Sequence, residues 1–223
     1  MKKLYVIIVT LMLTIAAMGQ LLSVRTGGVT YLFPAVKAGD MIFANGNEVT
    51  IMGKTFVLSA IEAMNVDQST VKDNAVSITY SGTTATVAIA GNVAPYVTAT
   101  VNGAHVSIEQ TNTDAVDGDE ITYTLSGETT NGSFSLSGSY KCTLALAGLT
   151  MTNPSGAAIN IDNSKRVQIS AKKNSENTRT DGSNGSQKGC IYSKGQIQLQ
   201  GNGTLNVKGN TKHAIKSGDY ISI

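Results

Sequence analysis

Apolar and polar positions repeat along the C-terminal part of the chain, between residues 157 and 223. The segment GCIYSKGQIQL (Gly189–Leu199) aligns with HAIKSGDYISI, and the earlier segment AAINIDNSKRVQI (Ala157–Ile169) fits the same template if two residues are inserted at its corner. The coinciding positions, each pair 24 residues apart, are Ile191 and Ile215, Ser193 and Ser217, Ile197 and Ile221, and Leu199 and Ile223. A unit this short cannot bury its apolar face alone, whereas stacked copies share one core. The pattern therefore predicts a β-solenoid, in the form of a parallel β-helix.

The solenoid pattern starts at Ile121 and is predicted to extend over residues 121–223. Short alternating runs follow one another, each closed by Gly or Asn, and such runs suit the interior of stacked parallel strands. The predicted inward-facing side chains are those of Ile121, Tyr123, Leu125, Phe134, Leu136, Cys142, Leu144, Leu146, Leu149 and Met151. Residues 174–188 contain no apolar side chain and are predicted to form one long surface loop. Since the pattern stops within a strand without a cap, we expect either a fragment of a longer protein or a partner that covers the end.

Two smaller β regions are expected ahead of the solenoid. Residues 20–67 form a small β unit with a hairpin turn at Asn45 and Gly46 and a helical turn at Ile61–Val66. Its predicted core consists of Phe33, Ile42, Phe43, Val49, Ile51, Phe56 and Leu58. Residues 68–120 form either a β lead-in to the solenoid or a small β domain of their own, because turns recur there about every ten residues, as in antiparallel β structure. The acidic run Thr111–Glu120 is interpreted as a solvated linker, with an Asp-rich calcium loop as the alternative.

Residues 1–19 have the features of a secretory signal peptide. Lys2 and Lys3 precede an apolar run at Leu4–Met18, and small residues precede a cleavage site before Gln20. The apolar run is short for a membrane span, so cleavage is favoured over a retained anchor. We expect an exported protein with no stable membrane span after cleavage, located in the periplasm, at the cell surface or outside the cell.

Charge and composition narrow the classes of partner. Residues 21–156 hold 5 basic and 11 acidic side chains, whereas residues 157–223 hold 10 basic and 4 acidic ones. This asymmetry points to a polyanionic partner for the solenoid half, or to attraction between the two halves. Aromatic residues make up 5% of the chain, which argues against an aromatic stacking platform. Cys142 and Cys190 are expected to be buried thiols rather than a disulfide, and no Cys/His spacing indicates zinc.

Several motifs in the expected order resemble an exported bacterial family of β-helical carbohydrate-binding domains, which is related in fold to pectate lyases. The resemblance covers roughly Glu120–Ile223, and its most specific pieces are NTRTDG (Asn177–Gly182), KGCIYSKG (Lys188–Gly195), GNGTLNV (Gly201–Val207) and GNTKHAIKS (Gly209–Ser217). It implies a right-handed parallel β-helix that binds acidic or cellulose-like polysaccharides without established cleavage, with calcium as a structural or bridging ion. Residues 21–66 separately resemble the leader β unit found ahead of such domains.

Two sets of side chains are candidate binding residues. Solenoid rungs stack about 4.8 Å apart, so basic side chains on successive rungs could follow a polysaccharide and pair with uronate carboxylates. This first set comprises Lys194, Lys212, His213, Lys216 and Asp219, and its alternative is a solvated basic corner. The second set, Asn177, Asp181 and Asn184, offers the oxygen ligands that Ca²⁺ takes, unless these residues only form turns.

The sequence thus predicts non-catalytic binding of a cell-wall or dietary polysaccharide, of an anionic, polygalacturonate-like kind. A calcium-dependent polysaccharide lyase is the first alternative, although Arg166 and Arg179, the arginines of the solenoid half, lie in no recognisable catalytic motif. A structural surface or adhesin spacer is the second. Only His105 and His213 are available, which leaves no arguable Ser-His-Asp set. Export argues against nucleic acid as a partner, and the oligomeric state stays open.

Overall fold

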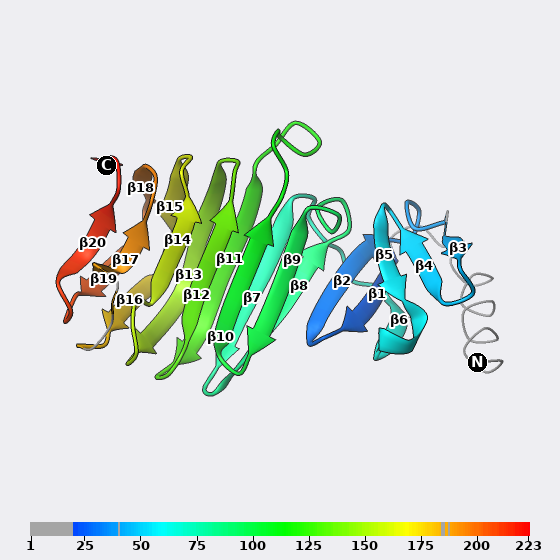
Figure 1. The fold of residues 1–223 in the computed structure, drawn as a ribbon, viewed down its shortest axis with the longest axis horizontal. Helices are drawn as coiled ribbons and strands as arrows, with labels where there is room; N and C mark the ends of the chain where they lie inside the picture. The colour runs from blue at the N-terminus through cyan, green and yellow to red at the C-terminus, as the bar shows by residue number, and fades with distance from the viewer. Residues whose placement is uncertain (1–19, 40, 184–185, 187) are drawn as a thin grey trace.

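The computed structural model describes residues 20–39, 41–183, 186 and 188–223. These residues form β-strands joined by turns, with one short 3-10 helix and no α-helix among them, so the fold is all-β as expected. The chain runs from one end of an elongated molecule to the other (Figure 1). The predicted signal peptide and Asn184 lie outside the described residues. Within the described part of the chain, no helix is long and apolar enough to cross a membrane.

The N-terminal part holds two small groups of antiparallel strands. Its elements are β1 (Leu21–Thr26), β2 (Val29–Pro34), β3 (Ile42–Ala44), β4 (Glu48–Ile51), β5 (Lys54–Val57), the 3-10 helix η1 (Leu58–Ala60) and β6 (Ala63–Asp67). Strand β1 pairs with β2 and β6, while β3, β4 and β5 form a sheet of their own. Asn45 and Gly46 make the β3–β4 turn with φ of 54° and 68°, as predicted from their tolerance of positive φ.

Two predictions for this part are wrong. The expected helical turn at Ile61–Val66 is instead mostly strand β6, whose backbone pairs with β1. Ile42 and Phe43 are not core residues, because β3 is an edge strand with all its side chains exposed, at 63% and 40% for these two. The remaining predicted core residues of this part, Phe33, Val49, Ile51, Phe56 and Leu58, are buried.

The middle of the chain forms two antiparallel hairpins, as the spacing of its turns predicts. The strands are β7 (Ala75–Ser81), β8 (Thr84–Ala90), β9 (Val97–Asn102) and β10 (His105–Gln110). Strand β7 pairs with β8, and β9 pairs with β10. Strand β8 also pairs in parallel with β2, which joins the N-terminal strands to the large sheet.

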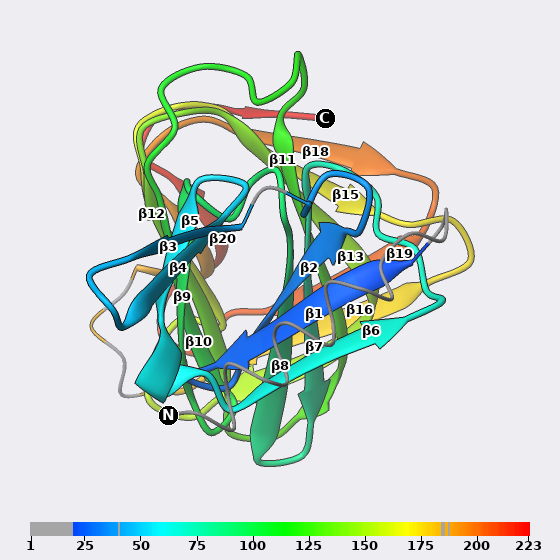
Figure 2. The same ribbon diagram turned by 90° about the vertical axis from the view of Figure 1, so that its right-hand side faces the viewer.

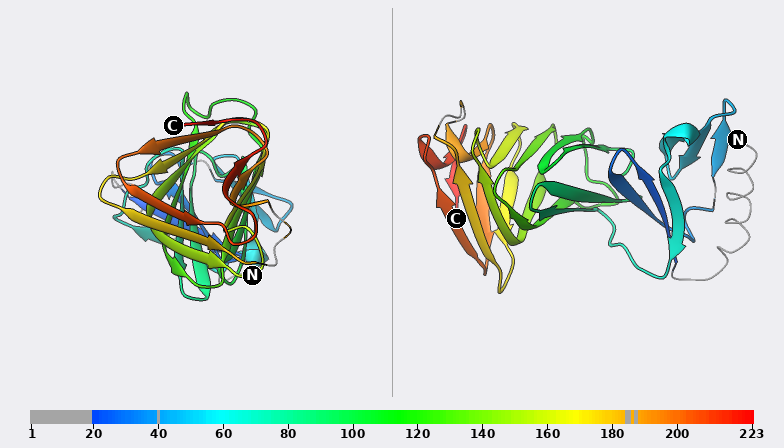
Figure 3. Two further views of the ribbon diagram at one scale, coloured as in Figure 1. Left: turned by 90° about the vertical axis from the view of Figure 1, so that its left-hand side faces the viewer. Right: turned by 90° about the horizontal axis from the view of Figure 1, so that it is seen from below.

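From residue 121 onward the strands stack in parallel. They are β11 (Ile121–Thr129), β12 (Ser133–Gly138), β13 (Cys142–Asn153), β14 (Ile159–Asn163), β15 (Val167–Ala171), β16 (Glu176–Asp181), β17 (Gly189–Ser193), β18 (Ile197–Gly201), β19 (Thr204–Lys208), β20 (His213–Ser217) and β21 (Ile221–Ser222). The first ladder runs β7–β11–β13–β15–β18–β21 and the second β10–β12–β14–β17–β20. A third runs from the second half of β13 through β16 to β19. Seen from either end, the ladders surround a common interior (Figures 2 and 3).

The strand register confirms the alignment that the sequence pattern gives. Ile191 lies opposite Ile215, and Ser193 opposite Ser217, in the β17–β20 pair. Ile197 lies opposite Ile221 in the β18–β21 pair. All ten side chains predicted to face inward between Ile121 and Met151 are buried.

Strand β16 is the largest departure from the sequence prediction. Residues 174–188 are not one loop, because residues 176–181 pair in parallel with β13 on one side and β19 on the other. Asn177, Arg179 and Asp181 face the interior and are buried. The Asn177 and Asp181 side chains are tolerated there because buried polar groups that form hydrogen bonds lose little relative to water.

Candidate functional site

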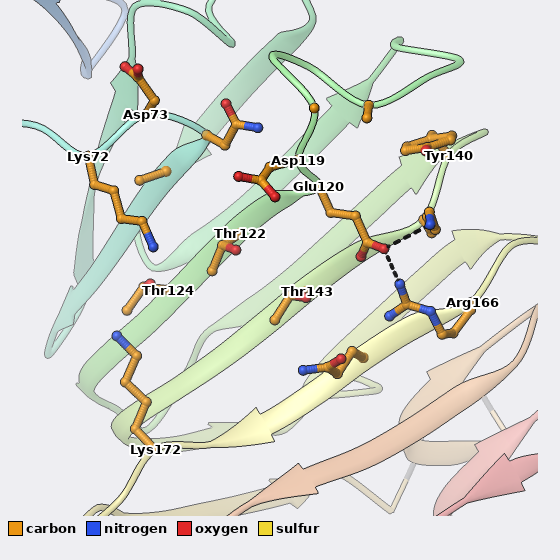
Figure 4. A pocket seen from close by; sticks show the side chains of 16 residues that line it. Lys72, Asp73, Asp119, Glu120, Thr122, Thr124, Tyr140, Thr143, Arg166 and Lys172 are labelled. Atoms are coloured by element: carbon orange, nitrogen blue, oxygen red, sulfur yellow. Dashed lines mark hydrogen bonds and ion pairs between the residues drawn. The ribbon is translucent and has the colours of Figure 1, made fainter.

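A cleft of about 500 Å³ lies over the outer face of the first ladder (Figure 4). Alternation along each strand places one set of side chains in the interior and the other outside. The outward set forms the floor of this cleft, in which Thr122, Thr143 and Gln168 lie opposite one another on β11, β13 and β15. Thr124 follows on β11. The floor is therefore a row of hydroxyl and amide groups at the spacing of paired strands.

A partly buried ion-pair cluster borders one side of the floor. Glu120, just before β11, holds Oε1 at 3.3 Å from Lys141 Nζ and also pairs with Arg166 Nη2. Glu120 and the Arg166 side chain are only about one-fifth exposed, so the cluster is shielded from water more than an ordinary surface pair. Tyr140, next to Lys141, adds an aromatic ring to the same border (Figure 4).

The acidic run Thr111–Glu120 is not a free linker, because its second half contributes Ala115, Gly118, Asp119 and Glu120 to a wall of the cleft. Val116 and Asp119 exchange two backbone hydrogen bonds of 3.0 Å, which closes a tight turn. The buried side chain of Asn74 donates from Nδ2 to the carbonyl oxygen of Val116 at 2.6 Å and holds this turn against the start of β7. The Asp119 and Glu120 side chains consequently border the floor (Figure 4).

The chemistry of the cleft suits recognition of a polar ligand by hydrogen bonds. Hydroxyl, amide, carboxylate and ammonium groups converge on one elongated surface, and such groups bind the hydroxyls of a sugar as donors and acceptors. No histidine or cysteine lines the cleft. Among the described residues, no three His, Cys, Asp or Glu side chains come together as a metal site would require.

The basic set predicted from the sequence lies elsewhere, at the corner and strand of β17 and β20 in the second ladder. Lys216 is opposite Tyr192, whereas Lys194 follows Ser193 and forms an ion pair with Asp162 at 3.2 Å, with both side chains exposed. The two lysines are therefore two positions out of register. None of the predicted residues Lys194, Lys212, His213, Lys216 and Asp219 lines the cleft.

The predicted calcium set is not presented to solvent in the described part of the chain. Oδ1 of Asn177 accepts hydrogen bonds from the N–H groups of Gly148 and Leu149, both at 3.0 Å. The Asp181 carboxylate accepts backbone hydrogen bonds from Asn210 and, at 3.3 Å, from Thr211. These oxygens face N–H donors of neighbouring coils, and Ca²⁺ binding there stays a prediction.

Sequence reasoning considered Arg166 only for the lyase alternative, and it missed the other residues that border the cleft: Lys72, Asp119, Glu120, Tyr140, Lys141 and Lys172. They belong to four separate segments, so no local motif contains them. One signal was available. The outward positions of ITYT, CTL and VQI include Thr122, Thr143 and Gln168, which lie side by side when these runs stack in register.

Comparisons with known proteins find similarity over part of the chain. Residues 118–223, somewhat less than half of the chain, match the sequence model of a family described as "Carbohydrate-binding domain-containing protein". A protein of that same description from Acetivibrio thermocellus is 26% identical over 136 residues, which cover 52% of this chain and 48% of the relative. The chain thus spans about half the length of the curated relative that it matches.

A solved structure has a similar fold. It is the polysaccharide lyase-like protein from C. thermocellum, determined as a gadolinium derivative, with a TM-score of 0.50 and 23% identity. The similarity covers 60% of this chain and 52% of that one. The C-terminal half of this chain is therefore similar in sequence to carbohydrate-binding domains, within a fold similar to that of a polysaccharide lyase-like protein.

Proposed function

We propose that this protein binds a polysaccharide without cleaving it and that the ligand lies in the cleft over the first ladder. The observation that carries the proposal is the row of Thr122, Thr143 and Gln168, which offers hydrogen-bonding groups in register across three strands. Stacked strands repeat every ~4.8 Å, so an extended chain of sugars can follow such a row. The sequence match over residues 118–223 supports the same function.

The finer features expected from the sequence belong to this proposal. We take residues 121–223 as a right-handed parallel β-helix, preceded by the lead-in at 68–120 and the small β unit at 20–67. The polysaccharide is anionic, since residues 157–223 carry an excess of basic side chains. The predicted set on β17 and β20 is an accessory surface for the same ligand, and the protein acts after export. Calcium, if it takes part, bridges protein and polysaccharide.

Affinity electrophoresis of the chain without residues 1–19 tests the binding site. Wild type is expected to be retarded in gels that contain polygalacturonate, and Thr143→Trp to lose this retardation because its indole fills the cleft floor. Ser135→Trp is the matched control, since Ser135 is an outward-facing residue of β12 on the second ladder. Equal retardation of the two variants would place the ligand elsewhere. Repeating the gels with calcium and with chelator tests the ion.

A polysaccharide lyase is the second candidate. The favouring observation is that Glu120 fixes the Arg166 guanidinium beside Lys141 in the cleft, because lyases need a cation at the uronate carboxylate and a base at the adjacent proton. β-Elimination creates an unsaturated product that absorbs ultraviolet light. Growth of this absorbance with wild type, and its loss in Arg166→Gln, would replace the binding proposal with a lyase.

A further inference from the structure

The cations that line the cleft fall into two kinds. Lys141 and Arg166 share the carboxylate of Glu120, which compensates one of their two positive charges. Lys72 and Lys172 also line the cleft, but no ion pair joins either of them to a carboxylate among the described residues. Lys72 and Lys172 are thus the cleft cations that form no ion pair with a carboxylate in the described part of the chain.

These two lysines come from distant parts of the chain. Lys72 precedes β7 and Lys172 directly follows β15, 100 residues later. In Figure 4 both side chains extend over the floor, and both ammonium groups point toward the region of Thr124. Two like charges directed at one region repel each other, and an anion between them removes this repulsion and adds attraction to both.

We propose that Lys72, Lys172 and Thr124 form a subsite for an oxyanion substituent of the polysaccharide, either a carboxylate or a sulfate ester. The ammonium groups supply charge as compact points, which suits either group, and the Thr124 hydroxyl donates a hydrogen bond. This inference rests on the proposed function and assigns the recognition of the acidic group to one end of the cleft. The ion-paired end at Glu120 is left to neutral hydroxyls of the sugar.

Only part of the subsite lies within the residues that match the family model. Lys172 lies within the matched residues 118–223, whereas Lys72 lies in the preceding segment. The lead-in thus contributes half of the charge that selects the ligand. A chain with the matched region but a different residue at position 72 is expected to bind the same sugars with weaker preference for acidic ones.

Replacement of a solvated lysine that does not contact the ligand would leave binding unchanged. The chain offers such a lysine as a matched control. Lys173 is adjacent to Lys172 and exposed, but it does not line the cleft. The double variant Lys72→Ala/Lys172→Ala is therefore compared with Lys173→Ala in the chain without residues 1–19. Both remove exposed side chains, and circular dichroism with thermal unfolding verifies that each variant is folded.

Retardation is measured in gels containing polygalacturonate, fully methyl-esterified polygalacturonate or a sulfated galactan. We expect the double variant to bind its acidic polymer about tenfold more weakly than wild type, as the loss of two charge contacts implies, and Lys173→Ala to bind like wild type. On the esterified polymer all three proteins should behave alike. The wild-type advantage should shrink as salt is added, because the lysines are exposed.

The outcomes separate the subsite from the proposed function. Loss on polygalacturonate assigns the group as a carboxylate, and loss confined to the sulfated galactan assigns it as a sulfate ester. If the double variant binds acidic polymers as tightly as Lys173→Ala while Thr143→Trp does not bind, the subsite is wrong and the cleft stands. If wild type binds no polymer, the proposed function fails and the subsite with it.

Discussion

Asn177 should be among the side chains on which stability depends most. It is fully buried, and its amide links its own segment to two others, at residues 148–149 and 204. Oδ1 accepts from the N–H groups of Gly148 and Leu149 at 3.0 Å, while Nδ2 donates to Ser175 Oγ at 2.9 Å and to the Thr204 carbonyl at 3.1 Å. Asn177→Ala removes all four hydrogen bonds.

The expected magnitude follows from the groups left unpaired. A buried donor or acceptor without a partner costs about 1–3 kcal/mol, and at least the Leu149 N–H is in this situation. With partial costs at the other groups, we expect the free energy of unfolding to fall by about 2–5 kcal/mol, a large share of the ~5–15 kcal/mol that is typical of a domain. At a urea m-value of roughly 2 kcal/mol/M, the unfolding midpoint would fall by about 1–2.5 M.

The assay is urea unfolding followed by circular dichroism, with Asn206→Ala as control. Asn206 is exposed, and its amide donates only a 3.5 Å hydrogen bond to Glu176, so its loss should cost less than about 0.5 kcal/mol. A loss below about 1 kcal/mol in Asn177→Ala would refute the reasoning. The difference between wild type and Asn177→Ala should be equal with calcium and with chelator. A difference that requires calcium would instead support the predicted ligand role.

Three further predictions concern other buried or constrained positions. Burial lowers the pKa of Arg179 to about 10, and its Nε and Nη2 lack hydrogen-bond partners among the described residues. Arg179→Met should therefore leave the free energy of unfolding unchanged or raise it by about 1–4 kcal/mol. A loss above ~2 kcal/mol in urea unfolding would contradict this expectation. Cys142 and Cys190 are buried free thiols, as predicted, and burial raises the pKa of each from 9.0 to about 12, so neither should react with a thiol reagent before unfolding. The thiols lose their protons at lower pH in the unfolded state than in the folded state. Their contribution to stability is therefore complete below about pH 9 and is lost as the pH rises toward 12. Urea unfolding midpoints of wild type and of a Cys142→Ala/Cys190→Ala variant, measured across this pH range, test this dependence. Gly127 has φ of 87°, and an added Cβ would lie 2.0 Å from the Tyr80 carbonyl oxygen. Gly127→Ala should therefore be far more destabilising than Gly148→Ala, where φ is 75° but the space around the added Cβ is open. Similar melting temperatures of the two variants would argue against the close approach at Gly127.

The positions of the strands from Ile121 onward, with the exception of β16, their inward-facing residues and the register between them could be predicted from the sequence, because each depends on short-range alternation. Successive strand side chains point to opposite faces, so the alternation of apolar and polar residues in a run such as Ile121–Leu125 is enough to predict which face is buried. The 24-residue spacing of Ile191 and Ile215 then gives the register, since stacked copies share one core. This reasoning fails at the edge strand β3, where apolar residues have no covering layer.

Tertiary structure alone decided which polar residues face inward and where the cleft forms. The sequence pattern predicts Asn177 and Asp181 as loop residues. Their burial is stabilised by backbone N–H groups from other segments of the chain, and no local pattern reveals these partners. The cleft likewise brings Lys72 beside a floor built from β11, β13 and β15. Hydrophobic alternation is encoded residue by residue, whereas partners for buried polar groups and the convergence of charges exist only once the strands have assembled into their ladders.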